Sequence, residues 1–132
     1  MTHDDPTFDE HREKQSRAVP GGRAFWWTDR LWQHAQGLPV TTVRLADVPE
    51  LDLDCWFGDT RPPTCRAVAA HARRIYEADL TYPVVLSSDG SLMDGGHRIA
   101  KAWLDGQHEV AAVQFAADPD PDWVVLDIAP QG

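Results

Sequence analysis

The stretch Ser87–Gly106, SSDGSLMDGGHRIAKAWLDG, carries the strongest structural pattern in the chain. It predicts a tight turn at Ser88–Gly90, a short strand at Ser91–Met93, a glycine corner and then a helix. We expect this helix to begin near His97 and to end at Gly106, because a glycine just past a helix readily adopts the left-handed conformation. The pattern therefore places two adjacent glycines at the leading end of a helix.

The glycine corner predicts a seat for phosphate. Gly95 and Gly96 allow a sharp turn and leave their N–H groups unobstructed, and a helix N-terminus adds unpaired donors and the positive end of its dipole. Arg98 adds a forked cationic donor for phosphate oxygens, and Lys101 lies one turn further along the helix. We therefore expect Gly95, Gly96, His97, Arg98 and Lys101 to hold the phosphates of a nucleotide.

Three side chains at this corner each have two interpretations. Asp94 either caps the helix or serves chemistry, as a ligand for Mg²⁺ or as a base towards a substrate hydroxyl. His97 either donates to a phosphate oxygen or pins the turn through a main-chain bond. Arg98 either binds phosphate or forms an ion pair with Asp94. The sequence leaves these alternatives open.

The run Pro83–Phe115, PVVLSSDGSLMDGGHRIAKAWLDGQHEVAAVQF, resembles the core of the ParB N-terminal/sulfiredoxin-like superfamily. The likeness covers Pro39–Phe115 in element order and is specific over Asp94–Ala102. Members bind nucleoside diphosphates or triphosphates on this turn, and they include CTP-dependent partition proteins, ATP-dependent sulfiredoxins and ADP- or ATP-dependent free-serine kinases. The resemblance implies a small ParB/sulfiredoxin-like domain that binds ATP, ADP or CTP together with Mg²⁺.

Two departures from the superfamily narrow these expectations. Sulfiredoxins place a reactive cysteine immediately before the His-Arg pair, where this chain has Gly96, so we do not expect sulfinic-acid repair. Partition proteins continue into a helix-turn-helix domain, whereas this chain ends soon after the core. We therefore do not expect DNA binding of that kind.

The acidic loop 50–59 follows the first predicted strand of this core. In the resemblance it faces the nucleotide, and the serine kinases use an acid from that region as a base. The loop offers four acids, of which none aligns uniquely: Glu50, Asp52, Asp54 and Asp59. Each one taken singly is more simply a solvated loop charge. We take Asp54, together with Asp94 and His97, as the candidate catalytic residues, and we expect Trp56 and Phe57 to plug the core rather than stack on a base.

The composition sets the class of protein. The 132 residues suit one compact domain with tails, and 42% of them are hydrophobic. The formal charge of −9 disfavours broad attraction to nucleic acid or to an anionic membrane, and no apolar run approaches the length of a membrane span. Cys55 and Cys65 have no metal-binding spacing and follow no secretory signal, so we expect reduced thiols in a cytoplasmic protein.

The chain predicts three segments: a flexible leader at 1–22, a domain at 23–116 that includes an aromatic helix, and an acidic strap at 117–132. The aromatic stretch at 25–32 predicts a helix capped by Thr28 and ended by Gly37. We expect these aromatic side chains to pack as a flap over the core. The alternatives are a stacking platform for a nucleobase or a partner-binding patch, which includes a homodimer interface.

The remaining elements complete a mixed α/β domain with a sheet of about four or five strands, flanked by two main helices. Apolar patterns predict strands at Pro39–Val48, Tyr82–Leu86 and Glu109–Phe115, with an edge strand or strap at Trp123–Ile128. Thr64 predicts the N-cap of a helix that runs to Glu77. We expect its buried stripe to contain Val68, Ala69, Ala72, Ile75 and Tyr76, and we expect His71 to be a packing or surface residue rather than a metal ligand.

Two main functions of different class follow. The first is an enzyme that transfers a phosphoryl group between a nucleotide and a small hydroxylated metabolite, for which the acids of the 50–59 loop and Asp94 are suited. The second is a module that binds nucleotide without turnover and switches its contact with another protein. A nuclease is a weaker third reading, because the net negative charge opposes it.

Overall fold

A computed structural model describes residues 12–127 of the chain, which form a mixed α+β structure. These residues divide into two compact units. We call residues 12–36 with 118–127 the terminal unit, and residues 37–117 the central unit. Each unit is described by itself.

The terminal unit is an antiparallel three-stranded sheet followed by a short helix. Strands β1 (Lys14–Val19), β2 (Gly22–Trp27) and β7 (Trp123–Leu126) pair in the order β1-β2-β7, and α1 (Thr28–Ala35) continues directly from β2. The flexible leader expected at 1–22 is therefore wrong for residues 14–22, and residues 1–11 lie outside the described part. The expected edge strand near Trp123 is confirmed as β7, while residues 128–132 of the acidic strap also lie outside the described residues.

Aromatic side chains pack within the terminal unit itself. Phe25 stacks on Trp123 with ring centroids 5.0 Å apart, Trp27 lies 4.8 Å from the same indole, and Trp26 is buried. The cap expected from Thr28 is wrong, because Trp27 occupies the N-cap position and its N–H donates to the carboxylate of Asp122 at 2.8 Å. The aromatic stretch thus stabilises its own sheet.

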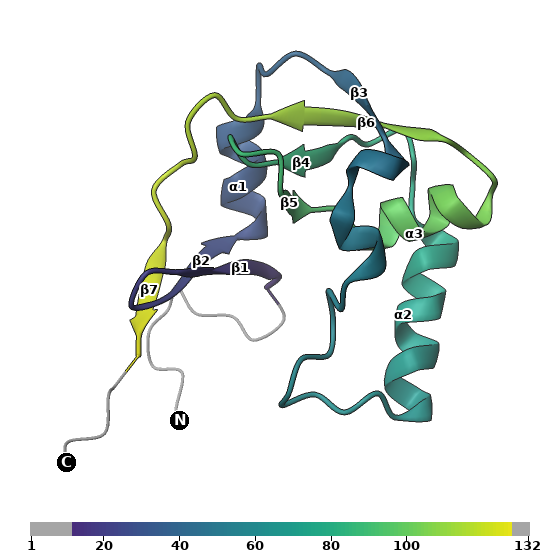
Figure 1. Cartoon of the computed structure of the whole chain (residues 1–132), viewed down its shortest axis with the longest axis horizontal. Helices are drawn as coiled ribbons and strands as arrows, with labels where there is room; N and C mark the ends of the chain where they lie inside the picture. The colour runs from purple at the N-terminus through teal and green to yellow at the C-terminus, as the bar shows by residue number, and fades with distance from the viewer. Residues whose placement is uncertain (1–11, 128–132) are drawn as a thin grey trace. The chain divides into compact units, whose positions relative to one another are not determined.

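The central unit is built on a four-stranded mixed sheet in the order β3-β6-β4-β5 (Figure 1). Its strands are β3 (Thr41–Arg44), β4 (Val84–Leu86), β5 (Leu92–Asp94) and β6 (Glu109–Gln114). The β4–β6 pair is parallel and the other two pairs are antiparallel. Both strands predicted to be interior, β4 and β6, do lie in the middle of the sheet. The strand expected at Pro39–Val48 is shorter, because the chain turns into two 3₁₀ helices, η1 (Leu45–Asp47) and η2 (Pro49–Asp52).

Helix α3 (Gly96–Leu104) covers this sheet and α2 (Cys65–Glu77) packs against α3. Ile99 and Ala102 of α3 join the core of the central unit, whose other buried members are Leu45, Val48, Val84, Leu86, Val110 and Ala112. The apolar side of α3 therefore fixes the position of its own first turn relative to β4 and β5. That first turn is the predicted phosphate seat.

Two glycine-dependent turns bracket this region as expected. Gly90 has φ +88° in the loop between β4 and β5, and its N–H donates to Ser87 O at 2.9 Å. Gly106 has φ +74°, and the bonds Gly106 N–H to Trp103 O and Gln107 N–H to Ala102 O form a Schellman motif. The predicted end of the helix is therefore confirmed.

The buried face expected for α2 is wrong except at Ile75, which does lie on the inward side. None of its residues is fully buried, and its inward face consists of the partly buried Ala67, His71 and Ile75. Val68 and Tyr76, which we expected on the buried stripe, are 48% and 82% exposed. The N-cap is as predicted, because Thr64 Oγ1 accepts the Ala67 N–H at 3.1 Å. Over residues 12–127, no helix has the length and apolar character to cross a membrane.

Candidate functional site

The first turn of α3 depends on Gly95, which occupies the N-cap position with φ +131°. A Cβ at Gly95 would lie 2.6 Å from Val84 Cγ1, so no larger residue fits between this turn and β4. The helical hydrogen bonds begin with Ile99 N–H to Gly95 O at 3.0 Å. The amides of Gly96 and His97 precede that bond and therefore have no helical carbonyl partner.

Asp94 and Arg98 form an ion pair across this turn. Arg98 Nη2 donates to Asp94 Oδ2 at 3.3 Å, and the side chains are 19% and 15% exposed respectively. Of the two interpretations of Arg98, the ion pair is therefore present. Asp94 is not the N-cap residue, because Gly95 occupies that position. The pair holds a guanidinium at the turn in a largely buried place.

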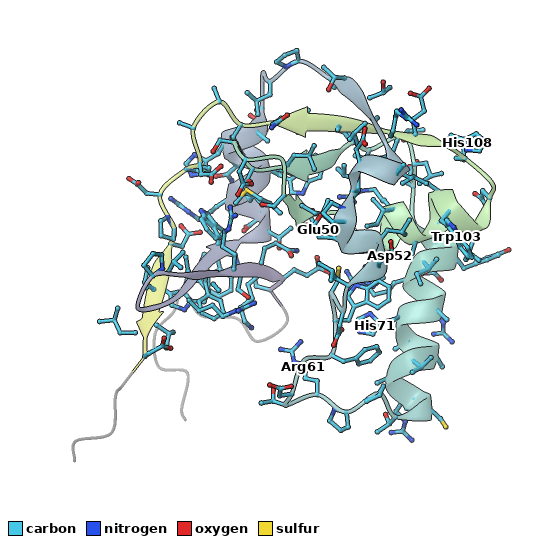
Figure 2. All side chains as sticks on the ribbon, in the orientation of Figure 1. Glu50, Asp52, Arg61, His71, Trp103 and His108 are labelled. Carbon is cyan, nitrogen blue, oxygen red and sulfur yellow. The ribbon has the colours of Figure 1, made fainter. Side chains whose placement is uncertain are left out.

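Three aromatic rings form a stack beside the turn. The rings of His71 and His97 are inclined by 11°, and His71 Nδ1 lies 2.8 Å from His97 Nε2. The Trp56 indole lies nearly parallel to both, with centroids 4.8 Å from His71 and 4.7 Å from His97. Figure 2 shows His71 pointing from α2 towards the loop that carries this tryptophan. The indole thus covers a hydrogen-bonded pair of imidazoles, one from each helix.

The indole also lies over the glycine corner. A Cβ at Gly96 would lie 3.1 Å from Trp56 Nε1 and 3.5 Å from Cys55 Cβ. The 55–56 loop therefore occupies the space beside the Gly96 Cα.

Burial and nearby positive charges disfavour protonation of both histidines. Burial first, and then the charge of Arg74, His71 and Arg98, lowers the pKa of His97 from 6.5 to about 4. Burial, Arg74 and Arg61 also lower the pKa of His71. Three arginines from three parts of the central unit thus act on one pair of imidazoles.

Asp54 fixes the conformation of the loop that carries Trp56. Its carboxylate accepts the N–H groups of Trp56, Phe57 and Gly58 at 2.9, 2.8 and 2.8 Å. These bonds lower the pKa of Asp54, which makes its carboxylate a weaker base. The candidate base of the sequence analysis is therefore engaged in positioning the indole.

Glu50 differs from the other acids of the same loop. Its Oε1 is buried and has no hydrogen-bond partner within residues 12–127. Asp52, Asp54 and Asp59 are exposed. Glu50 lies on η2, which packs against α3, and its carbonyl is 3.5 Å from Cys55 Sγ (Figure 2). A buried carboxylate oxygen without a protein donor can accept a hydrogen bond from a ligand or from water.

Lys101 lies outside this group of contacts, and the surroundings of Cys55 disfavour its thiolate form. Lys101 Nζ donates to Tyr76 O at 2.7 Å, so its charge neutralises the C-terminal end of α2 rather than the phosphate turn. Partial burial, followed by the charges of Glu50 and Asp54, raises the pKa of the Cys55 thiol. Cys55 and Cys65 are both free thiols, as expected.

Asp94 is the carboxylate at the turn whose chemistry suits Mg²⁺. Within the described residues, no group of three or more His, Cys, Asp or Glu side chains could hold a metal ion. Asp94 alone would supply one carboxylate oxygen, and Mg²⁺ at phosphate sites commonly uses one or two carboxylates and completes its shell with phosphate oxygens and water.

The contacts of His71 and Trp56 with His97 at the turn were not predicted from the sequence. Spacing carried no signal for them, because His71 and His97 lie on different helices. The available hint was the dense arginine content of 61–74, which contains Arg61, Arg66, Arg73 and Arg74 and no acid.

No protein-family model, curated protein or solved structure is significantly similar to this chain.

Proposed function

We propose that the central unit binds the phosphates of a nucleotide at the first turn of α3. The observation that carries the proposal is the turn itself, where the amides of Gly96 and His97 have no helical carbonyl partner and Arg98 lies beside them in its pair with Asp94. A helix N-terminus, guanidinium groups and neutral imidazoles all donate hydrogen bonds, and phosphate accepts them. The likeness to the ParB/sulfiredoxin-like superfamily rests on the same turn.

The first candidate function is that of an enzyme that transfers a phosphoryl group to a small hydroxylated metabolite. Glu50 is the acid best suited to accept the proton of the acceptor hydroxyl, since its buried Oε1 lacks a partner among the described residues. Asp94 would position Mg²⁺ after release from Arg98, and Arg98 would then face the phosphates. Bound with the nucleotide, Mg²⁺ would neutralise phosphate charge.

Binding without turnover is the second candidate function. The observation that favours it is the engagement of Asp54 with its own loop and of Asp94 with Arg98, which occupies two of the three proposed catalytic residues. In this reading the nucleotide displaces Trp56 from Gly96, and the moved loop changes a contact with another protein.

The test is a binding series with ATP, ADP, CTP and GTP, each with Mg²⁺. We expect one of them to raise the melting temperature and to bind in calorimetry, and Arg98→Ala to weaken binding by about tenfold or more. Arg44→Ala, on an exposed position of β3, is the matched control and should bind normally. A wild-type chain that responds to none of the four nucleotides would refute both readings.

Phosphorus NMR separates the two readings. With pooled hydroxylated metabolites, the enzyme consumes nucleotide and Glu50→Gln slows that consumption by about a hundredfold or more. Tight binding without consumption in the wild type assigns the chain to the second reading.

A further inference from the structure

The outward side of α2 carries an apolar stripe. Val68, Ala72 and Tyr76 recur every four residues, so they lie above one another along the helix. All three are exposed, with Val68 at 48% and Tyr76 at 82%. This exposed apolar stripe is accessible to another molecule.

Guanidinium groups border this stripe. Arg73 lies three residues before Tyr76 and so neighbours it on the helix surface, Arg66 lies on the same line as Arg73 seven residues earlier, and Arg61 precedes the helix. Arg61, Arg66 and Arg73 form no ion pair with residues 12–127. The acid on α2 is Glu77, in its final residue.

Helix α3 lies against the C-terminal end of α2. Lys101 of α3 bonds to Tyr76 O, which brings the two helices together there. Trp103, two residues further along α3, is 63% exposed and is labelled beside that end of α2 in Figure 2. We call Val68, Ala72, Tyr76 and Trp103 with Arg66 and Arg73 the α2 surface.

We propose that the α2 surface binds an acidic amphipathic segment of a partner protein. Apolar side chains of such a segment would cover Val68 and Tyr76, and its carboxylates would meet Arg66 and Arg73. Charge complementarity selects this partner, since Arg66 and Arg73 of the surface form no ion pair with residues 12–127.

Two other occupants fit less well. A second copy placed by twofold symmetry on this surface would bring arginines of one copy towards those of the other. A nucleic acid would satisfy the arginines but would leave Val68 uncovered, and the remainder of an acidic chain would repel it.

The test uses the full chain and three labelled probes in fluorescence anisotropy. The first is a peptide of about 20 residues with leucine at helical i, i+4 and i+7 positions and glutamate elsewhere. The second has lysine in place of every glutamate, and the third is a single-stranded DNA of about 20 nucleotides. We expect binding of the acidic peptide alone, weakened about tenfold or more between about 0.05 M and about 0.5 M NaCl.

Variants assign the binding to the α2 surface. The double change Arg66→Glu, Arg73→Glu should weaken the acidic peptide by about tenfold or more, and Tyr76→Ala by about fivefold. Arg44→Glu on β3 should change it by less than about twofold. Circular dichroism verifies that each variant is folded, which these exposed positions permit.

Four results would overturn the proposal: no binding of the acidic peptide, equal binding of the lysine peptide, tighter binding of DNA, or insensitivity to the charge reversal. Sedimentation that shows a dimer broken by Tyr76→Ala would assign the surface to a second copy instead.

Discussion

At the scale of single residues, Gly95 is the position on which the turn depends most. Its φ of +131° is unfavourable for any residue with a Cβ, and an added Cβ would overlap Val84. We predict that Gly95→Ala lowers the free energy of unfolding by about 3–5 kcal/mol, from backbone strain together with overpacking. Urea denaturation measures it.

The matched control is Gly58→Ala. Gly58 also has a positive φ, of +62°, but an added Cβ would lie in open space. Its replacement should cost about 1–2 kcal/mol, which is the strain alone. Equal losses for the two variants would contradict the close packing of Gly95 on β4.

His97 gives the chain a characteristic pH dependence. Its pKa of about 4 in the folded state lies below the ordinary value of 6.5, because of burial and nearby arginines. Between these values the unfolded chain binds a proton that the folded chain does not. The associated stabilisation is therefore complete above about pH 6.5 and is lost as the pH falls towards 4.

We predict that lowering the pH from about 7.5 to about 5 reduces the free energy of unfolding by about 1–2 kcal/mol through this group, since solvent screens part of the effect. In His97→Gln that fraction of the pH dependence should disappear, as measured by urea denaturation at both pH values. NMR titration of the imidazole that returned an ordinary pKa would show that the packing around His97 is looser.

At the scale of elements, the loop 54–58 is held by one carboxylate. Asp54 accepts three consecutive N–H groups and so fixes Trp56 over the histidine pair. We predict that Asp54→Ala speeds hydrogen exchange of the Trp56, Phe57 and Gly58 amides by about tenfold or more. Asp52→Ala, two residues earlier on an exposed side chain, should leave exchange in the loop unchanged.

Some turns and strands were predictable from the sequence because their signals are local. Gly90 and Gly106 each occupy the left-handed conformation that their sequence context demanded, and β4 and β6 are short apolar runs suited to interior strands. The hairpin strand β1, KQSRAV, was missed because its polar sequence resembles a solvated tail. This segment forms a strand because it pairs with β2, and its own composition does not reveal that pairing.

The face of α2 was mispredicted for a related reason. Alanines surround the helix, so two neighbouring stripes compete for the core. The contact of His71 with His97 and Trp56 selects the stripe that faces inward. The two histidines lie on different helices, so their spacing in the sequence does not predict that they pair. The glycine turn was predictable because its signal is local.

At the scale of the whole molecule, charge is unevenly distributed. The chain carries 12 basic and 21 acidic residues, yet residues 61–74 contain four arginines and no acid. The cationic groups at the histidine pair and those of the α2 surface come largely from this one segment. An anionic ligand at the α3 turn and an acidic partner on α2 would therefore both interact with the positive charges of this segment.

The division into two units leads to the last prediction. The core of the central unit is formed by residues of 37–117 alone, while the terminal unit joins segments from both ends of the described chain. We predict that a fragment of residues 37–117 folds with one cooperative urea transition and retains the far-ultraviolet circular dichroism of a mixed α+β protein. A fragment of 37–105 should not fold, because it lacks β6, which pairs with both β3 and β4. Failure of the longer fragment to fold, with the full chain folded under the same conditions, would mean that the central core needs the terminal unit.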